Sequence, residues 1–220
     1  KGNNLVDHTH TDLPEGASAN PFFGLEDPRL PIYAQPNRKG DYVGMFISES
    51  SADAATFTIE SLPGTAIIAT PDFSETLMDY AEVAFILSER NGWSQTEYEA
   101  GITASMEKWG VAEADIAAYT GAVPAASMEN VLTQKYIAMY MQGQQSWCEY
   151  RRTGYPKTLI PVYAEYSVED PSFDAIDPPG PQWVDKTFTP LVAEVTELSS
   201  RMRYPAQEQT LNGDNRKAAV

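Results

Sequence analysis

The pattern of apolar and polar positions changes character twice along the chain. Residues 1–73 are rich in Pro, Gly, Asn and Asp, which restrict helix formation and favour turns. Within this part, short extended segments are predicted at Tyr42–Ile47, Thr56–Glu60 and Ala66–Ala69. The apolar residues are too numerous for a free linker, so residues 1–73 are interpreted as ordered loops with minor strands.

Residues 74–155 have the pattern of packed helices. A nearly continuous apolar run, Leu77–Leu87, predicts a central helix, and the capping-box spacing of Asp72–Glu75 places its start. Asn91–Gly92 is the expected stop. A second capping box, Ser94–Glu97, begins another helix, which Lys108–Gly110 ends with a cation and a glycine. Two helices joined by so few residues form an antiparallel hairpin.

Two further helices are predicted after this hairpin. Val111–Ala122 is alanine-rich and short, and Ser127–Pro156 has a capping serine, helical apolar spacing and a Gly-Tyr-Pro stop. The latter is predicted as one long helix that packs against other helices. Seven aromatics at helical spacing are assigned to the core: Tyr80, Phe85, Tyr98, Trp109, Tyr136, Tyr140 and Trp147.

Residues 156–220 return to loops. The segment EDPSFDAIDPPGPQW is dense in proline, Thr189–Glu197 is ambiguous between helix and extended chain, and Arg201–Asn212 is interpreted as an extended arm. The helical hairpins suggest tetratricopeptide-like stacking, although the tetratricopeptide signature itself is absent. Periodicity alone therefore predicts a mainly α-helical chain with helices packed in pairs.

Charge and cysteine content narrow the possible functions. The formal net charge is −16, so electrostatic binding to nucleic acid or to anionic lipid is disfavoured. Cys148 is the only cysteine, which excludes an intramolecular disulfide, and it is predicted to be a small buried hydrophobe. No apolar window is long enough to span a bilayer, and no signal peptide is evident.

Four blocks in this chain are similar to segments of the SusD/RagB family of outer-membrane nutrient-binding lipoproteins. They are NPFFGLEDPRLPIY (Asn20–Tyr33), AEVAFILSERNGW (Ala81–Trp93), TQKYIAMYMQGQQSWCEYRRTGYP (Thr133–Pro156) and RMRYPAQEQTLN (Arg201–Asn212). The segment YEAGITASMEKWGV, which follows the second block, completes its helical hairpin. The third is the closest match, and the specificity comes from the order and spacing of the blocks.

The resemblance implies a tetratricopeptide-like α–α superhelix with long irregular loops and minor β structure. It implies a cell-surface protein that caps a SusC-like TonB-dependent transporter and holds an oligosaccharide, a peptide or another nutrient for import, without chemistry. Family members are longer and carry a lipidated N-terminal cysteine, which Cys148 cannot be. The chain is therefore expected to be the C-terminal portion of a longer, lipid-anchored protein, as a single domain fragment over residues 1–220.

Sugar recognition requires flat aromatic faces and fixed polar side chains on loops. In the family, the aromatic platform is largely built from loops before the hairpin that corresponds to Leu77–Trp109. This favours Phe22, Phe23, Tyr33 and Tyr42 as candidate ligand contacts, with Asn37 and Arg38 as polar neighbours. The alternative is that these aromatics only pin their loops to the helices.

No catalytic group, metal site or cofactor is predicted. His8, His10 and Asp12 have metal-like spacing in a terminal segment, which chance explains, and no pair among the 31 acidic residues is singled out for glycosidase chemistry. Arg151 and Arg152 are interpreted as helix-capping cations. The competing hypotheses are a helical-repeat scaffold that binds another protein and, with less support, a glycoside-active enzyme.

Overall fold

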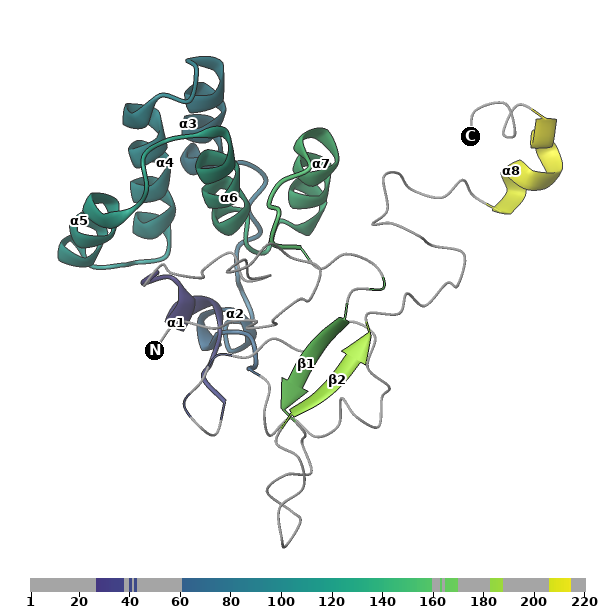
Figure 1. Ribbon diagram of the computed structural model, residues 1–220, viewed down its shortest axis with the longest axis horizontal. Helices are drawn as coiled ribbons and strands as arrows, with labels where there is room; N and C mark the ends of the chain where they lie inside the picture. The colour runs from purple at the N-terminus through teal and green to yellow at the C-terminus, as the bar shows by residue number, and fades with distance from the viewer. Residues whose placement is uncertain are drawn as a thin grey trace, which may run out of the picture.

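The computed structural model describes residues 27–37, 40, 42, 61–159, 163, 165–169, 183–187 and 206–214. Most of the secondary structure in these ranges is helical (Figure 1). The helices are α1 (Leu30–Tyr33), α2 (Thr65–Ile68), α3 (Tyr80–Arg90), α4 (Gln95–Lys108), α5 (Glu113–Ala122), α6 (Met128–Ala138), α7 (Gly143–Thr153) and α8 (Ala206–Leu211). Two strands, β1 (Glu165–Glu169) and β2 (Trp183–Thr187), pair antiparallel, with Ser167 opposite Asp185.

Helices α3 and α4 form the predicted hairpin and pack along their lengths. Gly92 follows α3 with φ +73°, a left-handed conformation that glycine adopts without steric cost. At the start of α4, the Ser94 hydroxyl donates to the Glu97 carboxylate instead of accepting from a backbone amide. Lys108 at the end of α4 reaches Asp79, the N-cap of α3, at 2.9 Å. The predicted order of the two helices and the residues at which each helix stops are confirmed.

The predicted start of α3 is wrong. The N-cap of α3 is Asp79 instead of Asp72, and the Glu82 amide donates to Asp79 Oδ1 at 3.0 Å. Asp79–Glu82 has the same capping-box spacing, and the aspartate there also pairs with Lys108. Leu77 therefore lies outside the helix and is 82% exposed, and Tyr80 at its first position is 65% exposed rather than in the core.

The predicted long helix after Ser127 is two helices. The Ser127 side chain caps α6 by accepting from the Asn130 amide at 3.2 Å, as the sequence indicates. The chain then turns between Met139 and Gln142, where Met141 has φ +69° and the Gln142 amide donates to the Met139 carbonyl at 2.8 Å. The turn redirects α7, which leaves no α7 residue fully buried; Cys148 is exposed, contrary to the prediction.

Three predictions about the loop-rich ends are also corrected. Ala66–Ala69 is not a strand, because α2 covers Thr65–Ile68. The segment after Pro156 contains β1 and β2 in addition to loops, and part of the supposed extended arm is α8. The segments Tyr42–Ile47, Thr56–Glu60 and Thr189–Glu197 lie almost entirely outside the described residues, so those predictions remain open.

The largest buried cluster joins α3, α4, α5 and α6. Its members are Ala81, Phe85, Tyr98, Ile102, Met106, Ile116, Tyr119, Val131 and Ala138. Phe85 and Gly101 show how closely α3 and α4 approach: a Cβ built at Gly101 would lie 2.7 Å from the Phe85 ring. This helical core confirms the mainly α-helical fold class; the division at residues 73 and 155 stays a prediction.

A polar network fixes α1 to the helical core. Arg29 is fully buried, and its guanidinium donates to Asp27, to Ser105 on α4 and to Gln134 on α6, the last two at 2.9 and 2.8 Å. Burial alone would lower the arginine pKa, but the adjacent carboxylate outweighs it and raises it. The segment before α1 is thereby held against α4 and α6.

Candidate functional site

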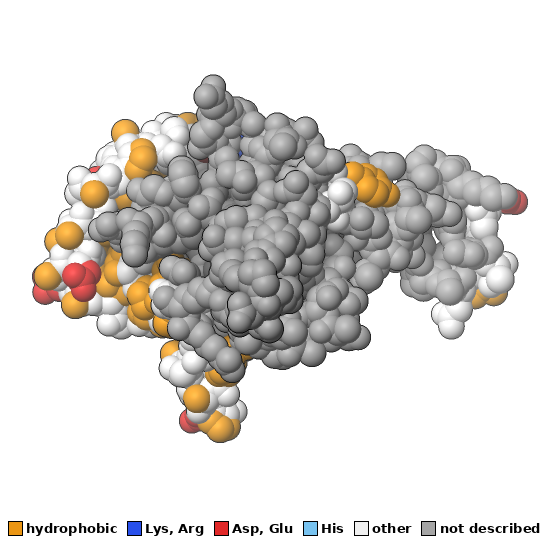
Figure 2. Space-filling model, turned by 60° about the horizontal axis from the view of Figure 1, so that its bottom comes forward, with side chains coloured by type: hydrophobic (Ala, Val, Ile, Leu, Met, Phe, Trp, Pro, Cys, Tyr) orange, Lys and Arg blue, Asp and Glu red, His pale blue; other side chains and the backbone are white. Residues whose placement is uncertain are grey.

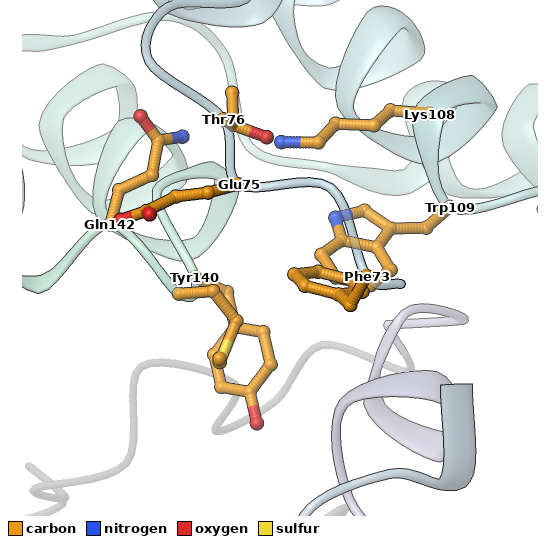
Figure 3. Close-up of a pocket in the computed structure, with 8 residues that line it drawn as sticks. Phe73, Glu75, Thr76, Lys108, Trp109, Tyr140 and Gln142 are labelled. Atoms are coloured by element: carbon orange, nitrogen blue, oxygen red, sulfur yellow. The ribbon is translucent and has the colours of Figure 1, made fainter. Parts of the chain in front are cut away.

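A hollow of about 260 Å³ lies where three segments meet. The loop before α3, the C-terminal end of α4 and the turn between α6 and α7 each contribute part of its lining (Figure 3). The lining residues are Phe73, Glu75, Thr76, Lys108, Trp109, Tyr140, Met141 and Gln142. Three aromatic rings and several polar side chains therefore share one small space.

The aromatic part of the lining is centred on Trp109. Trp109 follows α4 directly, and its ring lies 6.2 Å from Phe73 in a stacked arrangement and 6.1 Å from Tyr140 at a tilt. Behind these rings, Tyr33 packs edge-on to Trp109 at 5.1 Å and stacks on Tyr140 at 4.2 Å. These four rings from separate segments hold one another in place, as offset and edge-to-face aromatic pairs do.

The turn between α6 and α7 places Gln142 at the hollow. Its carbonyl accepts the Ser146 amide at 3.0 Å, so its backbone begins α7. The residue is 4% exposed, and neither its side-chain oxygen nor its nitrogen has a hydrogen-bond partner. Trp109 Nε1 is likewise buried without a partner. An unpartnered buried polar group costs about 1–3 kcal/mol, so such a pair calls for an explanation.

Charged groups stand at the same hollow. Lys108 is paired with Asp79 and lies over the Trp109 ring at 5.7 Å, while Glu75 is exposed. Figure 3 shows Lys108 directed towards Thr76, and the Tyr140 hydroxyl directed away from these groups. That hydroxyl donates to the Tyr33 carbonyl at 2.8 Å, and burial raises its pKa. Tyr140 thus offers the hollow its ring and not its hydroxyl.

Three of the predicted ligand contacts, Tyr33, Tyr42 and Asn37, lie among the described residues. Tyr33 is 2% exposed, and its hydroxyl donates to the Ile137 carbonyl at 3.2 Å, so it supports Trp109 and Tyr140 from behind. Tyr42 is half-buried and packs against the Leu30, Tyr33 and Ile137 cluster. Asn37 is also half-buried.

Three predicted contacts cannot be placed. Phe22, Phe23 and Arg38 lie outside the described residues. These assignments, together with those of Tyr42 and Asn37, stay predictions.

Sequence reasoning missed most of the hollow. Trp109 and Tyr140 were assigned to the core by their helical spacing, yet each is only half-buried and each stands beside a helix end. Gln142 carried no signal, because the break between α6 and α7 was not predicted. The available clue was Gly143, which lowers helix propensity at the point where the chain turns.

Within the described ranges, no three His, Cys, Asp or Glu residues gather in a way that would hold a metal ion. His8 and His10 are not among these residues. None of the described helices combines the length and apolarity that a bilayer span needs.

Comparison with known proteins places this helical chain in a family. A SusD-like family model, described as starch-binding and associating with the outer membrane, matches residues 17–170. The chain therefore belongs to the SusD-like family. This confirms the resemblance seen in the sequence blocks.

A chitin-binding SusD homologue from Flavobacterium johnsoniae is similar to this chain among solved structures. The two share 28% identity with a TM-score of 0.46, over 62% of this chain and 36% of the homologue. The chain thus spans little more than a third of that relative. No curated protein matches the chain.

Proposed function

We propose that this chain is part of a cell-surface receptor that binds an oligosaccharide for uptake across the outer membrane. Family membership over residues 17–170 supports the outer-membrane and glycan-binding assignment. In this proposal a SusC-like TonB-dependent transporter is the partner, and a lipid anchor outside this chain holds the protein at the surface. The protein binds its ligand and releases it unchanged, with no cofactor.

The observation that carries the proposal is the composition of the hollow. Trp109, Phe73 and Tyr140 supply ring surface for the apolar faces of a pyranose, and Gln142 supplies unpartnered hydrogen-bonding atoms for sugar polar groups. Tyr33 acts here by supporting two of these rings, whereas Tyr42, Phe22, Phe23, Asn37 and Arg38 remain proposed direct contacts. A volume of about 260 Å³ suits one sugar unit better than a long oligosaccharide.

A second candidate function is a helical scaffold that binds another protein. It is motivated by apolar side chains on the surface near the start of α3, where Leu77, Met78 and Tyr80 are 82%, 67% and 65% exposed. Figure 2 shows one face of the molecule, on which hydrophobic side chains lie at the surface among the described residues. An exposed apolar group of this kind marks a contact surface without naming its partner.

A glycan array, followed by titration calorimetry on the full-length protein, tests the first proposal. Saturable binding without released product is expected. Phe73→Ala should weaken binding, because it removes a ring from the hollow, while Leu77→Ala should not. The reverse pattern, with Leu77→Ala weakening a protein–protein contact and no glycan bound by folded protein, would favour the scaffold.

A further inference from the structure

We infer that the hollow takes an uncharged sugar and that Glu75 is the residue that discriminates against acidic sugars. The inference deepens the proposed function and rests on it. Its starting point is the charge around the hollow, where Glu75 and Lys108 are the two lining residues with charged side chains. Their surroundings differ, and this difference decides which sign of charge the hollow presents to a ligand.

The positive charge of Lys108 is already neutralised. Lys108 Nζ lies 2.9 Å from Asp79 Oδ2, and both side chains are partly buried. The other carboxylate oxygen of Asp79 accepts the Glu82 amide at 3.0 Å, so this aspartate is fixed at the start of α3. An acidic ligand would therefore have to compete with a carboxylate that the fold itself holds beside the lysine.

The negative charge of Glu75 is not balanced in this way. Glu75 is exposed, and it forms neither an ion pair nor a hydrogen bond with any residue that the structure describes. Next to the Lys108–Asp79 pair, it gives the hollow an excess of one negative charge. The formal net charge of the chain is −16, so the field of the whole protein has the same sign. A carboxylate or sulfate brought to the hollow therefore meets like charge, which opposes binding.

Hydrogen bonding favours the same class of ligand. Figure 3 shows the Glu75 side chain extending away from Lys108, on the side of the hollow where Gln142 lies. Gln142 is 4% exposed and its Oε1 accepts no hydrogen bond, so this side has two acceptors that need donors from a ligand. A sugar hydroxyl both donates and accepts, whereas an ionised carboxylate only accepts. Replacing a hydroxymethyl group by a carboxylate thus removes a donor and adds a repelled charge.

The unpartnered donors of the hollow do not discriminate. Gln142 Nε2 and Trp109 Nε1 are buried without a partner, and each can donate to a hydroxyl oxygen or to a carboxylate oxygen. The aromatic rings offer the same carbon surface to both kinds of sugar. The choice between a neutral and an acidic sugar therefore falls to the acceptors, and Glu75 is the charged one.

A glycan array with the full-length protein tests the class of ligand. It carries neutral oligosaccharides of glucose, galactose, mannose and N-acetylglucosamine, and the same oligosaccharides after oxidation of their C6 hydroxymethyl groups to carboxylates. The neutral forms should bind and their oxidised forms should bind less. Preferential or equal binding of the oxidised forms would overturn the inference and leave glycan binding intact. Folded protein that binds no member of the array would instead overturn the proposed function.

Variants assign the discrimination to one side chain. Calorimetry on a trimer that binds and on its oxidised form should give at least about fivefold tighter binding of the neutral trimer. This factor corresponds to two unit charges about 4–5 Å apart in water. Glu75→Gln keeps an acceptor for hydroxyl groups and removes the charge, so it should reduce this preference at least about threefold. An unchanged preference in Glu75→Gln would overturn the inference.

Glu129→Gln is the matched control. Glu129 is exposed at the start of α6, about 15 Å along the helix from the end that adjoins the hollow, and its substitution changes the net charge by the same amount. The preference for the neutral trimer should stay the same in this variant. Raising the NaCl concentration should narrow the preference in Glu129→Gln more than in Glu75→Gln, because salt screens the local repulsion that only the former retains. Equal effects of the two substitutions would show that net charge, and not Glu75, causes the discrimination.

Discussion

Arg29 and Asp27 form a fully buried ion pair in which the guanidinium Nε and Nη2 donate to the two carboxylate oxygens, at 2.9 and 2.5 Å. The two residues are separated by one position, so the pair itself is local. Its remaining bonds are long-range, because the same guanidinium reaches Ser105 and Gln134. A charged pair two residues apart thus joins the segment before α1 to two helices of the core.

Asp27→Asn should strongly destabilise the protein. The change leaves Arg29 buried without its counter-charge, and breaking a buried pair in this way costs about 3–5 kcal/mol. Denaturant unfolding monitored by circular dichroism measures the loss. Glu107→Gln, a change at an exposed acid on α4, is the control and should stay within about 0.5 kcal/mol. A loss of similar size in both variants would contradict the assigned role of the pair.

Gly101→Ala should destabilise the α3–α4 hairpin. A Cβ at this position would lie 2.7–2.9 Å from three ring atoms of Phe85, which is itself fully buried and cannot move freely. Overpacking of this kind costs about 1–3 kcal/mol. Gly121→Ala in α5 has nothing within 4 Å of the new Cβ and should be neutral or slightly stabilising, since alanine is the better helix former. Equal Tm shifts in the two variants would show that packing against Phe85 is not the cause.

The Arg152–Glu89 pair should make stability depend on pH. Arg152 donates to both Glu89 carboxylate oxygens, at 2.6 and 2.7 Å, and these bonds lower the pKa of Glu89 below its ordinary 4.5. Since the pKa of Glu89 is lower in the folded state, the pair stabilises the fold at pH values above the ordinary pKa. This stabilisation is lost as the pH falls through the lowered pKa. Both side chains are partly exposed, so it amounts to about 0.5–1 kcal/mol.

Glu89→Gln should therefore lower the free energy of unfolding at neutral pH and have no effect in strong acid. Unfolding curves of this variant and of the natural protein, measured across that range, should converge as the pH falls below the lowered pKa. A difference that persists at low pH would mean that the glutamate contributes through packing and not through its charge.

Glu82 should show the opposite dependence. Burial raises the pKa of this carboxyl, although Lys135 acts against the shift, and its Oε2 has no partner. A raised pKa in the folded state means that folding disfavours the charged carboxylate. The resulting cost to stability is absent below the ordinary pKa and grows as the pH rises through the raised pKa. Glu82→Gln should raise the Tm at neutral pH and leave it unchanged in acid. A lower Tm at neutral pH would show that attraction to Lys135 dominates.

Substitutions at Met141 should rank by their tolerance of the left-handed conformation. With φ +69° at this residue, glycine removes the steric cost and valine increases it, so stability should fall in the order Gly, Met, Val. The left-handed conformation costs about 1–2 kcal/mol for an ordinary residue. Met128→Val, at the helical first position of α6, controls for the loss of methionine and should have a small effect. An unchanged Tm in Met141→Val would contradict the strained turn.

The local signals in the sequence determined much of the helical region. Gly92 and Gly110 mark helix ends because only a left-handed residue closes those turns readily, and the Ser127 side chain begins α6 as its type predicts. The apolar run predicted a helix buried on most faces, but α3 buries one face only: Ala81, Ala84 and Phe85 are buried, whereas Ile86 and Leu87 are 36% and 40% exposed. Four ordered sequence blocks were enough to predict the family.

Only tertiary structure decided where the site lies. Asp72 and Asp79 offer the same capping spacing, and Asp79 is the one that meets Lys108 from α4. The aromatics Trp109 and Tyr140 have core-like spacing, yet the turn at Met141 leaves them half-buried beside Gln142. Helical periodicity reports which face of one helix is apolar, whereas a hollow forms between segments distant in the chain, and its geometry depends on contacts that no local pattern encodes.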